Sequence, residues 1–214
     1  MRSCLSNSTS IVQLLVKHKP DINSQALFGF NALLLSVQNE NVEITKLLLE
    51  NNADCNICIQ SKESIADTVN NHPKDTMGTL DEMKQVLCDD FVEDKSSHVA
   101  DYINKKSVDY AFDVVAGSSP LHFACFEGNI DIVCSLLDHS ANINITKEDG
   151  TTPLFYASEV GHDNIVRLLL DKGADKQICR LDGTSPLKIA TDNGHTSIVI
   201  MLTNHTKKED KLSS

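Results

Sequence analysis

The sequence predicts an all-α solenoid, in which helix-turn-helix units stack along a line and carry projecting hairpin loops. Three observations lead to this prediction: a period of 33 residues, a Ser/Thr-Pro-Leu start in each unit, and a glycine near the middle of each unit. The clearest starts lie at 119–121, 152–154 and 185–187. A single helix pair of this kind cannot bury its own apolar face, so its stability has to come from stacking against its neighbours.

Each residue type in the period has a mechanical reason. Ser119, Thr152 and Ser185 can cap a helix with their hydroxyl groups, and the proline that follows fits the first helical position, where no N–H is needed. Eight residues after each proline lies a glycine, which can take the left-handed conformation that ends a short helix. The apolar run that comes next, for example at 165–170, predicts a second helix antiparallel to the first.

The motifs Ser-Pro-Leu-His at 119–122, Gly-His at 161–162 and Gly-Ala-Asp at 173–175 resemble the signatures of the ankyrin-repeat family. The resemblance implies that partners are bound in a concave groove lined by first helices and loop tips. It also implies that His122 ties neighbouring loops together by hydrogen bonds. An earlier unit departs from the family pattern, because Glu40 stands at the mid-unit glycine and would cost about 1 kcal/mol in a left-handed turn.

The period divides the chain from end to end. Val99, Ala100 and Ile103 lie 33 residues before second-helix positions of the next unit and so indicate a degenerate unit. The stretch before it is too short for a unit, and we expect one short helix near 65–70 there. The predicted divisions are a truncated repeat at 1–28, a repeat at 29–61, an insertion at 62–83, a degenerate repeat at 84–116, repeats at 117–149 and 150–182, a C-terminal repeat at 183–206 and a polar tail at 207–214.

The composition limits the class of partner. There are 30 acidic residues against 19 basic ones, and the formal net charge of -11 repels phosphate backbones, which argues against nucleic acid. No stretch reaches the roughly 20 apolar residues that a membrane helix needs, so membrane insertion is not expected. Seven cysteines, an odd number without a framework spacing, predict an intracellular protein, cytoplasmic or nuclear, with reduced thiols. We expect it to be monomeric.

Two groups of residues could carry chemistry, and neither is expected to do so. Cys55 and Cys58 form a C-x-x-C motif, but no second pair of ligands lies at zinc-finger spacing. His122 and Cys125 lie within one turn of a short helix that is needed for stacking, which is a poor setting for a nucleophile and its base. We therefore expect no catalytic residue, no metal and no cofactor, and we do not expect an enzyme.

The expected partner-binding site has an apolar part and an acidic part. The apolar part lies at the loop tips of the weaker units, where an exposed cluster rimmed by charge is typical of a binding hot spot. The alternative is that the insertion at 62–83 folds over this cluster and buries it. The acidic part indicates a basic or mixed partner surface. The predicted site residues are Phe28, Phe30, Val115, Phe126, Glu148, Asp149, Glu159, Leu181, Asp182 and Asp192.

The expected function is that of a protein-protein interaction module, an adaptor or scaffold whose partner is another protein. The alternative is an ankyrin-repeat fragment of a larger effector, such as a kinase, a ubiquitin ligase or a channel. That alternative arises because Met1 falls inside a first helix and the last unit lacks the polar outer face of a capping repeat.

Overall fold

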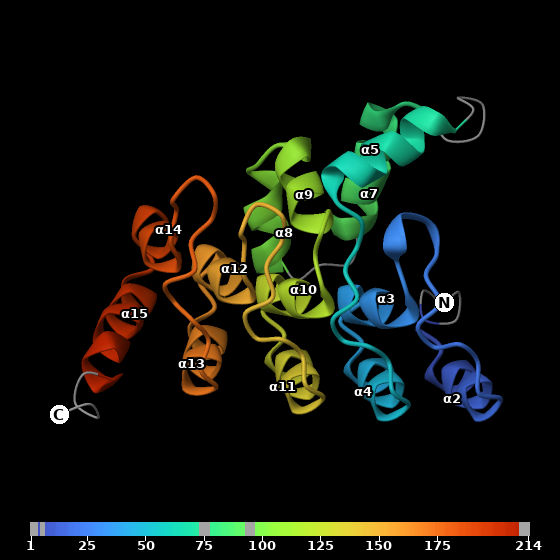
Figure 1. Cartoon of the computed structure of the whole chain (residues 1–214), viewed down its shortest axis with the longest axis horizontal. Helices are drawn as coiled ribbons and strands as arrows, with labels where there is room; N and C mark the ends of the chain where they lie inside the picture. Colours follow the sequence, from blue (N-terminus) through green and yellow to red (C-terminus); the bar gives the residue numbers. More distant parts are fainter. Residues whose placement is uncertain (1–3, 5–6, 73–77, 93–96, 210–214) are drawn as a thin grey trace.

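The computed structural model describes residues 4, 7–72, 78–92 and 97–209, and the regular structure in these residues is helical, without strands. Two rows of helices run along the molecule (Figure 1). The first helices of the units form one row, and the second helices, each joined to its partner by a short turn, form the other. The first row is α3 (Ala32–Gln38), α10 (Pro120–Glu127), α12 (Pro153–Val160) and α14 (Pro186–Asp192), and the second row is α2 (Thr9–Lys17), α4 (Val42–Glu50), α11 (Ile130–Asp138), α13 (Asp163–Asp171) and α15 (Thr196–Glu209).

The first helices begin and end as the sequence predicts. Each of the capping hydroxyls at Ser119, Thr152 and Ser185 accepts a hydrogen bond from the backbone N–H three residues further on. Gly161 ends α12 with a φ of 99°, and a Cβ added there would lie 2.6 Å from the imidazole of His195. Glycine is therefore required twice over at this position, by the left-handed backbone and by the close approach of the next unit.

The unit at 29–61 keeps the same frame with different residues. Asn31 caps α3 in place of Ser or Thr, because its side-chain oxygen accepts a hydrogen bond from the N–H of Leu34 at 2.8 Å. Glu40 has a φ of 53°, so the left-handed turn is retained without glycine, as predicted. Before this unit, a short 3-10 helix, η1 (Leu27–Gly29), forms the loop tip.

Histidines join successive units in the stack. His162 Nε2 donates to the carbonyl of Phe126 at 2.9 Å, and His195 Nε2 donates in the same way to the carbonyl of Glu159 at 3.0 Å. His122 Nε2 donates at 3.0 Å to the carbonyl of Thr151 in the next loop, which confirms the role that the resemblance implied. These bonds tie each unit to the next, and the carbonyls of Glu159 and Thr151 also accept from Asn193 Nδ2 and from the N–H of Lys147.

The stack passes directly from the unit at 29–61 to the unit at 117–149. Helix α3 packs on α10, and α4 packs on α11. Residues 62–116, here called the side segment, form α5 (Lys62–Asn71), α7 (Leu80–Val92), α8 (Ser97–Asn104) and α9 (Val108–Val115) beside the stack (Figure 1). The short helix expected near 65–70 is thus present in α5, but no unit at 84–116 stands in line between its neighbours.

The departure at 84–116 has a local cause. The period places a loop at 107–111, whereas Ser107 caps α9 by accepting a hydrogen bond from the N–H of Tyr110 at 3.2 Å. The helix that starts there buries Phe112 and Val115. The helix signal of a capping serine before an apolar stripe therefore outweighs the periodic loop position.

The side segment leaves and rejoins the stack at one place. The N–H of Gly117 donates to the carbonyl of Gln60 at 2.9 Å, and the N–H of Ile59 donates to the carbonyl of Ser118 at 2.9 Å. A third bond, from the N–H of Gln60 to the carbonyl of Phe28 at 2.8 Å, ties the same strand-like stretch to the preceding loop tip. The loops of the units at 29–61 and 117–149 are thus bonded to each other although residues 62–116 separate them in the sequence.

Candidate partner-binding face

One face of the stack combines the first helices α3, α10, α12 and α14 with the loop tips, and we call it the first-helix face. Its loop at 179–184 exposes Leu181 to 84% of the full area of that side chain, the largest value among the exposed apolar residues that the structure describes. The tip is nevertheless held firmly, because the N–H of Leu181 donates to the carbonyl of Asp149 at 2.8 Å. Gly150 permits this approach, since a Cβ there would lie 2.8 Å from the carbonyl oxygen of Cys179.

Ion pairing reinforces the two loop tips. Arg180 Nη2 lies 2.9 Å from Asp149 Oδ2, and the guanidinium of Arg180 stands 5.4 Å from the centre of the Phe155 ring. Burial by itself raises the pKa of Asp149, but the N–H of Thr151 and the nearby cations outweigh it and hold the pKa below its usual value. The carboxylate is therefore charged and fixes the geometry of the tips.

Acidic side chains are exposed on the same face as Leu181. Asp182 is exposed, and its carboxylate accepts a hydrogen bond from the N–H of Thr184 at 2.8 Å, which lowers its pKa. Asp192 and Glu148 are exposed on α14 and on the neighbouring loop tip. An apolar anchor with negative charge around it matches a partner surface that offers an apolar pocket with a basic rim.

Further along the same face, the side segment covers the first helices. The Tyr102 ring of α8 packs edge-on against Phe126, with ring centres 6.3 Å apart. Its hydroxyl donates to Glu159 Oε1 at 3.3 Å and accepts from Asn193 Nδ2 at 3.4 Å. Burial raises the pKa of Glu159 and raises that of Tyr102 to about 12. One side chain thus reaches three successive units.

A buried lysine holds α9 to the stack. Lys147 lies in the loop at 145–151, is only 9% exposed, and extends its ammonium group to the carbonyls of Asp113 and Val114 at the end of α9. It also donates to the hydroxyl of Tyr156 at 2.8 Å. Burial lowers its pKa to about 8. A cation at this helix end satisfies carbonyls that lack helical partners and interacts favourably with the helix dipole.

The structure corrects part of the predicted site. Phe28, Val115, Phe126 and Glu159 are buried and so do not belong to an exposed cluster, while Phe30 and Asp149 are half-buried. Tyr102 of α8, which lies outside the insertion at 62–83, packs against Phe126. The predicted residues that are exposed are Glu148, Leu181, Asp182 and Asp192.

Sequence reasoning missed the residues that cover this face. Tyr102 lies in the part of the sequence without a clear period, and Lys147 lies at a loop tip where a charge is usually solvated. A signal is present in the sequence, because two of the chain's three tyrosines, Tyr102 and Tyr110, fall within the side segment although its period is degenerate. A concentration of amphipathic aromatic residues indicates a packed contact.

The residues considered for chemistry occupy structural positions. His122 is fully buried, and burial together with nearby Lys147 lowers its pKa to about 3, while burial raises the pKa of the Cys125 thiol. Burial also raises the pKa values of Cys55 and Cys58, and the Cys55 thiol donates to the carbonyl of His139 at 3.3 Å. Thiolates are therefore disfavoured at these positions. Within the described residues, no group of three or more potential ligands could hold a metal ion.

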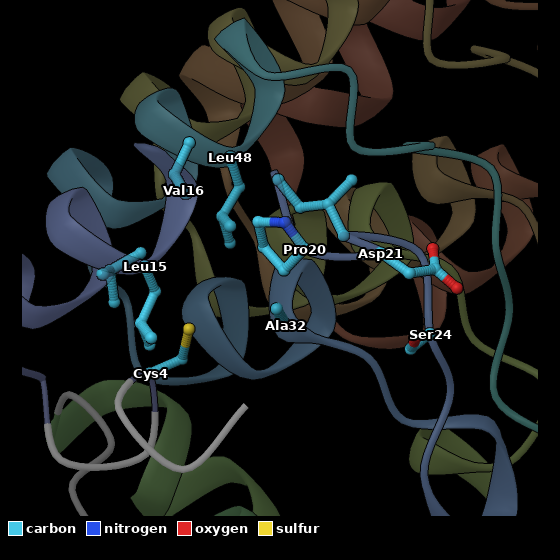
Figure 2. Close-up of a pocket in the computed structure, with 10 residues that line it drawn as sticks. Cys4, Leu15, Val16, Pro20, Asp21, Ser24, Ala32 and Leu48 are labelled. Atoms are coloured by element: carbon cyan, nitrogen blue, oxygen red, sulfur yellow. The ribbon is translucent and has the colours of Figure 1, made fainter. Parts of the chain in front are cut away.

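A separate hollow of about 130 Å³ lies at the N-terminal end of the stack, between α2 and α4 (Figure 2). Leu15, Val16 and Leu48 give it an apolar wall, and Asp21 and Ser24 lie to one side. The hollow lies where α2 packs on α4. Among the described residues that line it, no set of polar groups points at one position, as a ligand site would require. Across the described residues, no helix combines the length and apolar character that crossing a bilayer requires.

Comparison with known proteins agrees with this architecture. A search of curated proteins finds no match. The family model described as "Ankyrin repeats (3 copies)" matches residues 1–65, 88–180 and 121–212, which together make up most of the chain. The tandem helix pairs, the capping Ser/Thr-Pro pairs and the histidine bonds between units are thus those of a known repeat, and the chain belongs to the ankyrin-repeat family.

Proposed function

We propose that the chain is a protein-protein interaction module, an adaptor or scaffold that holds a partner protein on its first-helix face. Ankyrin repeats in general bind proteins. The observation that supports a site on this chain is Leu181, an apolar side chain 84% exposed on a tip whose backbone is fixed by Asp149. An exposed leucine on a rigid support loses little entropy on binding and can enter a pocket of a partner.

The charges around Leu181 support a partner with a basic rim. Asp182, Asp192 and Glu148 are exposed within the same face, and Lys188 is paired with Asp192 at 3.1 Å. With a formal net charge of -11, the chain attracts basic protein surfaces and repels nucleic acid.

We also propose that the module is not an enzyme and acts inside the cell, which the buried, protonated Cys125 and the odd number of cysteines support.

Photo-crosslinking from the tip tests this proposal. A photoreactive residue at position 184 should capture a defined partner from cells, and Leu181→Ser should abolish the capture, because the apolar anchor is lost. Leu14→Ser on α2 is a matched control, since Leu14 is an exposed leucine, at 57%, far along the stack. Both substitutions should leave the free energy of unfolding within about 0.5 kcal/mol of wild type. Equal capture by wild type and Leu181→Ser would exclude Leu181 from the site.

A further inference from the structure

The part of the first-helix face that the side segment covers combines two aromatic rings with a buried carboxylate. Phe126 and Tyr156 supply aromatic rings whose centres lie 5.4 Å apart, and Glu159 places a carboxylate beside them. These residues are 0%, 5% and 5% exposed, and Tyr102 of α8 contacts Phe126 and Glu159 directly. These residues form a recess that holds the ring of Tyr102, and the hydroxyl group of that ring reaches the carboxylate of Glu159.

The groups in this recess select a donor. Because Glu159 is largely buried, it favours an occupant that offers a hydrogen-bond donor, since an unpaired buried carboxylate is costly. Tyr102 supplies that donor, and Asn193 donates in turn to the Tyr102 oxygen. A phenylalanine would fill the ring space and leave the carboxylate without this bond. The recess therefore distinguishes tyrosine from phenylalanine by chemistry and not by size.

The occupant also carries a positive charge one helical turn after its tyrosine. Lys106 Nζ lies 5.0 Å from the centre of the Tyr102 ring and 5.5 Å from that of Tyr110. Both rings belong to the side segment, and towards the stack the charge of Lys106 acts on Glu159, where it lowers the pKa of the carboxyl group against the larger effect of burial. The feature that the face accepts is thus a tyrosine followed four residues later by lysine, on a helix and the turn that ends it.

The two helices that rest on the stack are attached differently. Helix α9 is joined through the backbone at Gly117 and through Lys147, whose ammonium group binds two of its carbonyls. The polar contacts of α8 with the first helices that the structure describes are those of the Tyr102 hydroxyl, at 3.3 and 3.4 Å. Displacement of α8 also has to release the buried side chains of Val99 and Ile103, whereas α9 keeps its own attachment through Lys147.

From these contacts we propose that the recess of Phe126, Tyr156, Glu159 and Asn193 is a binding site for a tyrosine-bearing helix of a partner protein, occupied in cis by Tyr102. A partner with a tyrosine and a lysine four residues later binds by displacing α8. This inference rests on the proposed function, because it assigns to the same first-helix face a second contact and the chemistry of its ligand.

Competition in cis predicts how affinity should change. When the binding-competent state is a minor one, the apparent affinity falls by the fraction of molecules in that state. A labelled peptide of sequence 97–107 serves as the probe, because it carries the tyrosine and the lysine of the natural occupant. Full-length Tyr102→Ala should bind this peptide at least about tenfold more tightly than wild type, since the competing side chain is gone.

Two comparisons make the test specific, and a replacement variant is available if the first one does not fold. A peptide with phenylalanine in place of tyrosine should bind the Tyr102→Ala chain several-fold more weakly. Adding Glu159→Gln to that chain should reduce the preference for tyrosine over phenylalanine, because a neutral amide oxygen is a weaker acceptor than a carboxylate. If Tyr102→Ala does not fold by circular dichroism, Tyr102→Phe takes its place, with a smaller gain over wild type.

Two results would overturn the inference: no binding of the peptide to the folded variants, or equal affinity for wild type and variant chains. Either of these leaves the proposed function standing if capture through position 184 still depends on Leu181. Conversely, loss of that dependence together with tight, tyrosine-specific peptide binding would reject the Leu181 site and keep the recess.

Discussion

The regular units at 117–206 and the side segment at 62–116 are both helical, yet different contacts fix their positions. Serine caps start α10 in the regular units and α9 in the side segment in the same way. In the regular units the same histidine bond recurs from one unit to the next. The side segment depends on contacts used once, such as those of Lys147 and Tyr102. Local sequence signals therefore determine which residues form helices. Contacts that recur between units determine how those helices are placed in the stack.

The largest expected effect contrasts one buried residue in each region. Leu169→Ala should lower the free energy of unfolding by about 2 to 5 kcal/mol, because Leu169 is fully buried between stacked helices and its truncation leaves a cavity. Ile103→Ala in α8 should loosen the side segment and shift the main transition less. Chemical denaturation followed by circular dichroism measures both. Equal shifts in one cooperative transition would show that the two regions unfold as one.

Acid should lower the free energy of unfolding of the regular units, through protonation of His122. The pKa of His122 falls to about 3 on folding from an ordinary value of 6.5, so the unfolded chain takes up the proton first. Its contribution to stability is complete above pH 6.5 and is lost as pH falls towards 3, by at most about 1.4 kcal/mol per pH unit. Unfolding free energies measured from pH 7 to pH 4 should show this slope, and His122→Gln should reduce it. Parallel curves for the two proteins would contradict the assignment.

Hydrogen exchange should separate the regions without mutation. Amides in 121–136 should be protected best, because α10 packs between α3 and α12. Amides in 62–71 should exchange at least about tenfold faster, a difference of about 1.4 kcal/mol in opening free energy, since α5 lies outside the stack. Mass spectrometry of peptides after timed exchange provides the measurement. Uniform protection from one region to the other would remove the distinction.

The smallest expected effect concerns exposed ion pairs. Lys188 and Asp192 are 58% and 54% exposed, and Lys62 and Asp113 are 45% and 43% exposed. Lys188→Ala and Lys62→Ala should each change the free energy of unfolding by about 0.5 kcal/mol or less, because exposed pairs gain little over solvation. A loss above about 1 kcal/mol for Lys62→Ala alone would show that this pair positions the side segment.

Much of the stack could be predicted from the sequence, because its rules are local and repeat. The serine and threonine caps, the left-handed turn at Glu40 and the helix at 65–70 all follow from residues close in the chain. The position of the side segment could not, since nothing in its sequence repeats a contact seen elsewhere. The period placed 84–116 in line, whereas its helices pack beside the stack.

The same limit explains the result for the candidate site. Periodicity places Phe126 and Glu159 on first helices and Leu181 on a loop tip, and the structure agrees with those positions. Whether such a residue meets solvent depends on what else folds onto that face. Leu181 is exposed because no described segment covers its tip, whereas Phe126 and Glu159 are covered by Tyr102 of α8. Exposure is therefore a long-range property that the pattern of one unit does not contain.

The hydrogen bond between Gly117 and Gln60 makes the place of interruption tolerant of change in length. The two ends of the side segment meet there, so the stack experiences it as a closed loop, and the entropy of closing a loop grows only slowly with the number of residues in it. Doubling the segment would cost about 0.6 kcal/mol in closure. A segment inserted between Gln60 and Gly117 can therefore be lengthened or replaced while the units on both sides keep their register. Repeat arrays of this kind thus have a route to acquire new domains.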